Sequence, residues 1–219
     1  MTSCVLSALV SVAVVVLFYI VYRLVRRVFR RGKDRFPVPF DATPRIAIVL
    51  GSGGHTGEML TLLDSLEKSL MKSSKPQWTF FVAESDTNSI GKLQIWLKSR
   101  PHASYSVIRI PRSREVGQTY VSAVFSSLKA FFVSLIKVHA LRPHCIITNG
   151  PGTAVPVVFA GLCLEIQTGN TIALFLAESF CRTETVSLTS RILMPFADEF
   201  FVYWPKLHEQ YPRSVLLAL

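Results

Sequence analysis

The residues best suited to chemistry lie in a glycine-rich loop that follows an apolar run. In order, the loop contains Gly51, Ser52, Gly53, Gly54, His55 and Thr56. Glycine lets a backbone come close to an anion, and the free N–H groups at the start of a helix attract negative charge. The loop is therefore typical of a phosphate site, with His55 as a general base or a hydrogen-bond donor to phosphate. A capping or packing histidine is the alternative role, and Thr56 is a candidate helix cap.

This loop matches neither of the two common nucleotide-binding templates. A dinucleotide fingerprint, G-x-G-x-x-G, needs glycine at position 56, where the sequence has threonine. A P-loop needs Gly-Lys-Ser or Gly-Lys-Thr, and the loop contains neither. A membrane-tethered, nucleotide-dependent oxidoreductase is therefore disfavoured.

Other candidate ligand groups follow three further apolar runs. A second glycine turn contains Asn149, Gly150 and Gly152. Arg112 and Arg114 lie on another loop, and arginine clamps phosphate oxygens with paired hydrogen bonds. For these arginines, the alternative is a solvated loop without a ligand. Glu178 is suited either to bind sugar hydroxyls or to cap the helix that follows it.

These groups must be positioned by an alternation of strands and helices. Apolar runs predict strands over residues 45–50, 78–84, 105–110, 144–149, 171–177 and 199–204, with a short last strand over 214–219. Helices are predicted over residues 57–71, 88–99, 118–140, 152–166 and 183–195. This order predicts an α/β domain, a Rossmann-like doubly wound parallel sheet. Ligands bind such a sheet at the carboxyl ends of its strands, where the candidate groups lie.

The first part of the sequence is long and apolar enough to cross a membrane. Residues 4–22 carry no charge and would form a helix about 28 Å long. Seven basic residues follow this run over residues 23–35 and none precedes it, the reverse of a cleaved signal peptide. We therefore predict a lumenal end over 1–3, a transmembrane helix over 4–22, a basic juxtamembrane linker over 23–44 and a cytosolic folded domain over 45–219.

Composition narrows the class of partner. Residues 23–35 contribute +6 of the net charge of +10, because they hold seven basic residues and one acidic residue. A nucleic-acid binder spreads basic residues over its folded surface, whereas this cluster suits anionic lipid headgroups at a membrane. The four cysteines have no zinc or disulfide spacing, so we expect buried thiols in a reducing compartment. No metal-ligand cluster is visible in the sequence.

Two of the predicted helices are unusually apolar. Residues 119–138 are long enough to span a bilayer, but Lys129 in their middle would cost about 2.5–3.5 kcal/mol there. Residues 153–166 are too short to span and contain Pro156. We expect both helices to be buried against the sheet. The alternative is that one of them rests on the membrane surface and holds the site near a lipid substrate.

Five stretches of the sequence are distinctive in combination. They read GSGGHTGEML, RIPRSREVGQ, TNGPGTAVP, ESFCRTETVSLT and FFVYWPKLHEQYP. Together they resemble the family of membrane-anchored subunits of the eukaryotic UDP-N-acetylglucosamine transferase of asparagine-linked glycosylation. The resemblance runs from about residue 45 to the C-terminus. It implies the N-terminal, acceptor-side half of an inverting GT-B glycosyltransferase, similar to the bacterial enzyme that makes the peptidoglycan lipid precursor.

The resemblance also implies a reaction and a partner. The family adds the second GlcNAc to dolichyl-diphosphate-GlcNAc on the cytosolic face of the endoplasmic reticulum. A small cytosolic subunit supplies the UDP-GlcNAc half, so this chain would bind no cofactor or donor and would be inactive alone. Length agrees, because one sheet domain of about 175 residues cannot form a two-domain cleft. The apolar tail over residues 214–219 is expected to be the last strand or to dock on the partner, and we predict that docking contributes.

Roles for individual residues also follow from the resemblance. The first glycine loop would hold the dolichyl diphosphate, and His55 would either take the proton of the attacking 4-hydroxyl or grip the diphosphate. Asn149, Gly150 and Gly152 correspond to a second loop, and Glu178 to the acid of the next one. The bacterial second loop is richer in glycine, which leaves the roles there open. The alternative function is a membrane scaffold with all chemistry on the partner, and anion-shaped loops argue against it.

Overall fold

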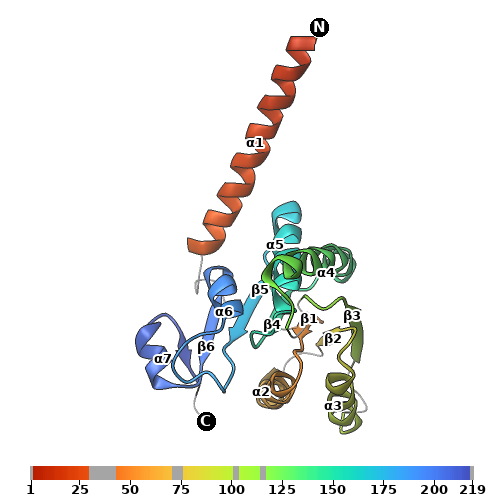
Figure 1. The fold of residues 1–219 in the computed structure, drawn as a ribbon, viewed down its shortest axis with the longest axis vertical. Helices are drawn as coiled ribbons and strands as arrows, with labels where there is room; N and C mark the ends of the chain where they lie inside the picture. The colour runs from red at the N-terminus through yellow and green to blue at the C-terminus, as the bar shows by residue number, and fades with distance from the viewer. Residues whose placement is uncertain (1, 30–42, 71–75, 101–103, 114–116, 218–219) are drawn as a thin grey trace.

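The computed structural model describes residues 2–29, 43–70, 76–100, 104–113 and 117–217 (Figure 1). The remaining residues include most of the predicted juxtamembrane linker and the candidate Arg114, which therefore lie outside the described residues. The folded domain contains a central sheet with helices on both faces, and a long N-terminal helix projects away from it.

The sheet has seven strands, which are all parallel. They are β1 (Arg45–Val49), β2 (Gln77–Ala83), β3 (Ser104–Ile110), β4 (Cys145–Thr148), β5 (Ala173–Ala177), β6 (Glu199–Val202) and β7 (Val215–Leu216). Their order across the sheet is β3-β2-β1-β4-β5-β6-β7. Each predicted strand is present, so the predicted doubly wound α/β fold is confirmed.

Helices cover the two faces of the sheet in two groups (Figure 1). The helices on one face are α2 (Gly54–Leu70) and α3 (Thr87–Lys98). The helices on the other face are α4 (Tyr120–Leu141), α5 (Ala154–Thr168) and α6 (Leu188–Leu193), which continues into the 3-10 turn η1 (Met194–Phe196). Alternate side chains of β1 pack into the hydrophobic core on each face of the sheet. Ile46 and Ile48 pack under α2, whereas Ala47 and Val49 pack under α5.

One short helix, α7 (Pro205–Gln210), was not predicted from the sequence. It begins with Pro205, which suits the first turn of a helix because that N–H needs no partner. Its six residues are too few to give a helical pattern. The helix contributes the fully buried Leu207 to the core under β6.

The direction of chain winding reverses between β1 and β4. From β1 the chain winds outward through β2 and β3, and from β4 it winds the other way through β5 and β6. After β1 and β4 the chain therefore continues to helices on opposite faces of the sheet, and the carboxyl ends of these two strands are where such a sheet binds its ligands. Both glycine-rich loops lie at this point.

Helix α4 is not simply a buried helix. It packs beside α5, but its outer face carries apolar side chains that are between 48% and 74% exposed: Val121, Val124, Phe125, Leu128, Phe132 and Ile136. By length and composition alone, Val121–Leu141 within α4 could also cross a membrane. The prediction that this helix is buried is therefore wrong for its outer face, which fits the alternative of an apolar surface resting on a membrane.

The N-terminal helix α1 (Thr2–Phe29) is longer than the predicted span and continues past residue 23, where the linker was expected. Its last turns dock on the folded domain. Arg27 is only 4% exposed, and its guanidinium pairs with Glu165 at 2.9 Å and with Asp198 at 2.7 Å. The same side chain also donates to the backbone oxygens of Phe196 at 3.0 Å and Ile172 at 2.7 Å. The basic segment therefore does not face lipid headgroups throughout, because Arg27 lies inside the protein.

Two further side chains of α1 contact α5 beside this cluster. Arg23 donates to the backbone oxygen of Glu165 at 2.8 Å, and Tyr19 donates to that of Ile166 at 2.9 Å. These contacts lie near the C-terminal end of α5, where backbone oxygens lack helical partners and basic groups are favoured. The helix is thus held along more than two turns.

Replacing Arg27 tests this attachment. We expect Arg27→Met to lower the free energy of unfolding of the full chain by about 3 kcal/mol, because two buried carboxylates lose their partner. Arg26→Met is the matched control, since Arg26 lies on the same helix and is exposed. Thermal denaturation of the detergent-solubilised protein measures both variants, and equal stabilities would contradict a docked α1.

Candidate functional site

The two glycine-rich loops touch each other at the carboxyl edge of the sheet. A Cβ atom added to Gly51 would overlap the side chain of Pro151, so the loops approach as closely as glycine allows. The side-chain amide of Asn149 donates to the backbone oxygen of His55 at 2.7 Å and ties the second loop to the first. The predicted residues of both loops are therefore brought together in one site.

The first loop turns sharply before α2. Gly53 has a φ of 69°, a left-handed conformation that favours glycine, and α2 begins at the next residue. His55 and Thr56 therefore lie in the first turn of the helix. Thr56 is fully buried and its hydroxyl contacts the backbone oxygen of Gly51 and the hydroxyl of Ser89. The prediction that Thr56 caps the helix is wrong, because it braces the loop from beneath instead.

His55 is half-buried at the rim of a large cavity. Its Nδ1 atom is buried and makes no hydrogen bond within the described structure. A buried polar atom without a protein partner is uncommon and calls for an explanation such as a catalytic role or a bound water. The exposed Ser52 and Gly54 flank the same cavity. The loop thus presents a histidine and the start of a helix to whatever occupies the cavity.

Glu58 is a site residue that the sequence analysis missed. It lies one turn after His55 on α2 and lines the same cavity. Its carboxylate accepts a hydrogen bond from the hydroxyl of Ser179 at 3.0 Å and from the amide of Asn149 at 3.4 Å. Burial, and secondarily the nearby Glu58 carboxylate, raise the pKa of Tyr203. The i, i+3 spacing from His55 could have revealed Glu58, because such residues share one face of a helix.

A buried carboxylate lies beside the second loop. Gly150 has a φ of 81°, and a Cβ there would lie 3.4 Å from the hydroxyls of Ser187 and Ser190. Glu178 is 1% exposed and accepts the backbone N–H groups of Ser179 at 2.9 Å and Ser187 at 2.8 Å. Glu178 therefore does not line the cavity. It fixes the backbone at Ser179 and Ser187, and because Ser187 is the N-cap of α6, Glu178 is not itself the helix cap.

Of the two predicted arginines, the structure describes Arg112. Its guanidinium donates to the hydroxyl of Ser52 at 3.4 Å, so it reaches the first glycine loop. Arg112, Ser52, Ser113 and Gly152 border a small cavity of about 90 Å³ beside that loop. The grouping of a guanidinium with two hydroxyls suits a phosphate oxygen. Arg114 lies outside the described residues.

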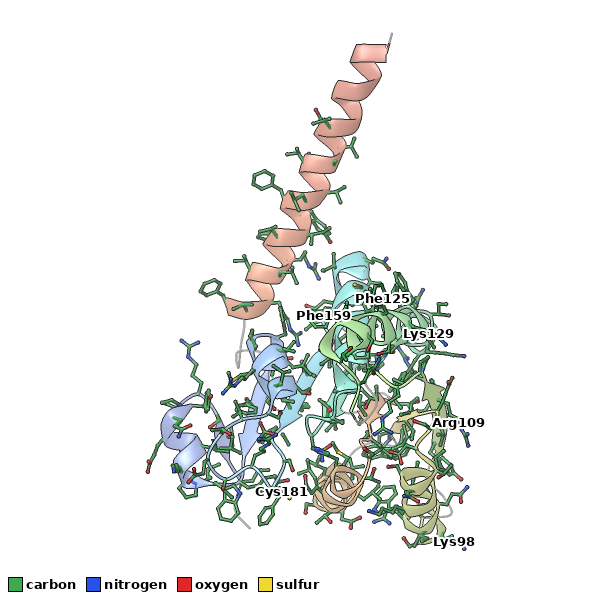
Figure 2. All side chains as sticks on the ribbon, viewed as in Figure 1. Lys98, Arg109, Phe125, Lys129, Phe159 and Cys181 are labelled. Carbon is green, nitrogen blue, oxygen red and sulfur yellow. The ribbon has the colours of Figure 1, made fainter. Side chains whose placement is uncertain are left out.

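The main cavity has a volume of about 1040 Å³ and extends from the loops along α4, α5 and α6. Its polar end includes His55, Glu58, Ser179 and Arg182, and its other end is apolar. Figure 2 shows Cys181 beside α2, whereas Phe125 and Phe159 lie on the side of the domain nearer α1. The volume is at the upper end of the range for small-molecule sites. The cavity is therefore suited to a ligand with a polar and an apolar part.

The cysteines and potential metal ligands limit the chemistry of the site. Cys145 is buried, but Cys163 is half-buried and Cys181 is exposed, so the prediction of buried thiols is wrong for Cys181. Burial raises the pKa of the Cys163 thiol, which keeps it protonated. Among the residues that the structure describes, no group of three histidine, cysteine or acidic side chains could hold a metal ion.

Comparison with known proteins identifies the family. Residues 46–219 match the family model described as "Oligosaccharide biosynthesis protein Alg14 like". The chain belongs to the Alg14 family. The matched residues comprise the whole sheet domain, so the predicted family resemblance is confirmed over both glycine loops and the cavity.

Curated Alg14 relatives cover most of the chain. The rat protein "UDP-N-acetylglucosamine transferase subunit ALG14" (Rattus norvegicus) is 40% identical over 187 residues, which is 80% of this chain and 84% of the rat protein. The human protein of the same name (Homo sapiens) is 38% identical and covers 81% of this chain and 85% of its own length. The Schizosaccharomyces pombe protein is 31% identical over 98% of this chain and 99% of its own length. The Alg14 relatives thus have closely similar lengths.

Among solved structures, the Alg14 chain is similar to Acinetobacter baumannii MurG, with a TM-score of 0.52 and 19% identity. The similarity covers 74% of this chain and 42% of the MurG chain, so this chain spans less than half of that protein. MurG is a GT-B glycosyltransferase. The predicted fold, one Rossmann-like half of a GT-B enzyme, is confirmed at the level of the fold.

The close contact between the two loops predicts that a methyl group added at Gly51 lowers the stability of the protein. We expect Gly51→Ala to lower the free energy of unfolding by about 1–3 kcal/mol, because the added Cβ would overlap Pro151 and force the loops apart. Gly57→Ala is the matched control, since a Cβ at Gly57 in α2 meets no atom within 4 Å. We expect that variant to be neutral or stabilised by up to about 1 kcal/mol. Thermal denaturation compares the two, and similar stabilities would contradict the tight contact.

Proposed function

We propose that this chain is the acceptor-binding subunit of a two-chain N-acetylglucosaminyltransferase. The reaction is transfer of the second GlcNAc from UDP-GlcNAc to dolichyl-diphosphate-GlcNAc in N-glycan precursor synthesis. The observation that carries the proposal is the match to relatives named UDP-N-acetylglucosamine transferase subunits over as much as 98% of the chain. The size of the domain supports a division of labour, because a GT-B active site lies between two Rossmann-like domains and this chain holds one.

The geometry of the loops supports the acceptor side of the reaction. The N-terminal turn of α2, the guanidinium of Arg112 and the hydroxyl of Ser52 gather at one rim, and a diphosphate would meet them there. His55 and Glu58 follow on the same helix face, close to where the first sugar would lie. We propose no donor contacts on this chain, and UDP-GlcNAc would bind to the partner subunit.

A membrane location is part of the same proposal. Helix α1 would anchor the chain in the endoplasmic reticulum membrane as a single-pass protein, with the folded domain on the cytosolic face. The exposed apolar face of α4 supports an additional contact with the membrane surface, because solvated apolar patches of this size are uncommon in soluble proteins. Exposed basic groups such as Arg26 would face anionic lipid headgroups.

In this mechanism His55 acts on the attacking hydroxyl. The 4-hydroxyl of the acceptor GlcNAc would attack the anomeric carbon of the donor in a single displacement, which inverts that carbon and releases UDP. A base must remove the hydroxyl proton as the new bond forms. His55 supports this role because its Nδ1 lacks a partner, whereas Glu58 is already engaged by Ser179 and Asn149.

Replacing His55 distinguishes a base from a diphosphate ligand. In a transfer assay with the partner, UDP-GlcNAc and a lipid-diphosphate GlcNAc, we expect His55→Ala to lower kcat by about 10²–10⁴-fold with KM for the acceptor nearly unchanged. A rise in KM at constant kcat would assign His55 to diphosphate binding instead. Unchanged values of both would favour the scaffold alternative. His139→Ala is the matched control, because His139 is half-buried on α4 and does not line the cavity.

The C-terminal tail is our candidate for the partner contact. Residues Val215 and Leu216 form the edge strand β7, and their side chains are 39% and 42% exposed. These two residues are the last strand of the sheet, and the predicted contribution of the tail to docking rests on their exposed apolar side chains. An edge strand with exposed apolar groups is a ready site for pairing with another chain.

Two variants test the tail. We expect deletion of residues 214–219 to abolish co-purification with the donor-binding subunit. Because the deletion also removes β7, Leu216→Glu is the sharper test, and we expect at least a tenfold loss of captured partner with an unchanged melting temperature. Ile95→Glu is the control, since Ile95 is a 70% exposed apolar residue on the distant helix α3. Full co-purification of the deletion variant would exclude the tail as a partner contact.

A further inference from the structure

Beyond the glycine loops, the main cavity continues as an apolar groove between three helices. Its walls are formed by Ala123, Val124, Leu128 and Phe131 of α4, Val155, Phe159 and Cys163 of α5, and Leu188 and Ile192 of α6. The charged residues that line the cavity, Glu58 and Arg182, belong to α2 and to the loop after β5, outside these walls. The groove is therefore a distinct apolar extension of the site.

The floor of the groove is a stripe along α5. From Ala154 to Glu165 this helix is buried except at Val155, Phe159 and Cys163, which are half-buried. A spacing of four residues keeps these three side chains on one face of the helix. At a rise of 1.5 Å per residue, the stripe extends about 12 Å away from the second glycine loop. The groove thus has a defined direction and begins at the loop.

The groove provides few hydrogen-bonding groups to a ligand. Ser127 lines it, but its hydroxyl already donates to the backbone oxygen of Ser113 at 3.0 Å. Thr189 of α6 is a second hydroxyl along these walls, while the hydroxyls of Ser113 and Ser187 lie at the end of the cavity beside the glycine loops. A nucleoside or a second sugar would leave its polar groups unpaired there, which is costly. An apolar chain would bury its surface without such a cost.

The groove also opens toward the exposed face of α4. Val124 and Leu128 line the cavity and are at the same time 57% and 48% exposed. They adjoin Phe125 and Phe132, which are 70% and 60% exposed on the outer side of that helix. A chain leaving the groove would therefore pass directly onto the apolar outer face of the protein rather than into water.

We propose that this groove binds the first isoprene units of a polyprenyl diphosphate whose head group occupies the glycine loops. The inference rests on the proposed function, because that function supplies the lipid diphosphate. It adds a chain-binding subsite with its own residues, and a binding contribution from the lipid that is separate from membrane partitioning. An acceptor with a chain too short to reach Cys163 would lose this contribution.

Protection of Cys163 tests the subsite directly. The full chain is reconstituted in phosphatidylcholine nanodiscs, treated with a small neutral thiol reagent, and analysed by peptide mass spectrometry to separate Cys163 from the other cysteines. We expect geranylgeranyl diphosphate to slow the labelling of Cys163 at least fivefold, whereas dimethylallyl diphosphate and inorganic diphosphate leave its rate unchanged. Unchanged labelling with all three would overturn the proposal. Equal protection by geranylgeraniol would also overturn it, because the groove would then take any apolar chain independently of the head group.

Kinetics provide a second measurement that separates this inference from the proposed function. The reconstituted two-chain enzyme is assayed with GlcNAc-diphosphate acceptors carrying dimethylallyl or geranylgeranyl chains. We expect Cys163→Phe, which fills the far end of the groove, to raise KM for the geranylgeranyl acceptor at least tenfold and to leave KM for the dimethylallyl acceptor unchanged. Each methylene group excluded from the groove is worth about fourfold in binding.

A control completes the kinetic test. Ile136→Phe adds similar bulk to the exposed face of α4 outside the groove. We expect this variant to keep the chain-length preference of the wild-type enzyme. If the wild-type enzyme transfers GlcNAc to neither acceptor, the proposed function fails. If it transfers to both and Cys163→Phe changes their KM values equally, only the groove assignment fails.

Discussion

A buried guanidinium joins three parts of the chain that are far apart in the sequence. Arg27 brings together the end of α1, the carboxylate of Glu165 on α5 and the carboxylate of Asp198 before β6. Asp198 in turn accepts the backbone N–H of Leu174 in β5 at 2.7 Å, so the ion cluster is joined to the amino ends of β5 and β6. Such a cluster is rigid because no member can leave without stranding a charge. It therefore fixes the direction in which α1 projects relative to the domain.

The orientation of the site follows from this attachment. Helix α5 receives α1 near its C-terminal end and carries the second glycine loop at its N-terminal end. The same helix thus transmits the position of α1 to the loops through about fifteen residues of rigid backbone. Helix α4 packs beside it and points its apolar face outward. The N-terminal helix, the apolar face and the ligand loops are consequently held in one fixed arrangement.

The fold could be predicted from the sequence because parallel strands that are buried on both faces are continuous apolar runs. The loops could be predicted because glycines at strand ends allow sharp turns and close approaches of the backbone that other residues cannot make. Contacts between distant elements could not be predicted. Nothing in the local pattern distinguishes the buried Arg27 from the exposed Arg26, and nothing in the apolar composition of α4 shows which of its faces lacks a partner. The roles of Glu58 and Thr56 depend on residues far away in the sequence, Ser179 after β5 and Ser89 in α3, that fold against them.

The amphiphilic cavity explains why one domain needs both the loops and the apolar helices. The inner wall of the groove and the outer face of the domain belong to the same helix, since Phe131 lines the cavity while the adjacent Phe132 is exposed. A lipid chain that leaves the groove therefore passes directly from the inner wall of α4 onto its apolar outer face. Every 100 Å² of chain kept out of water along this path is worth about 2.5 kcal/mol. Under the proposed function, the head group would then reach the carboxyl ends of the strands without exposing the chain, and the donor-binding subunit would act on it there.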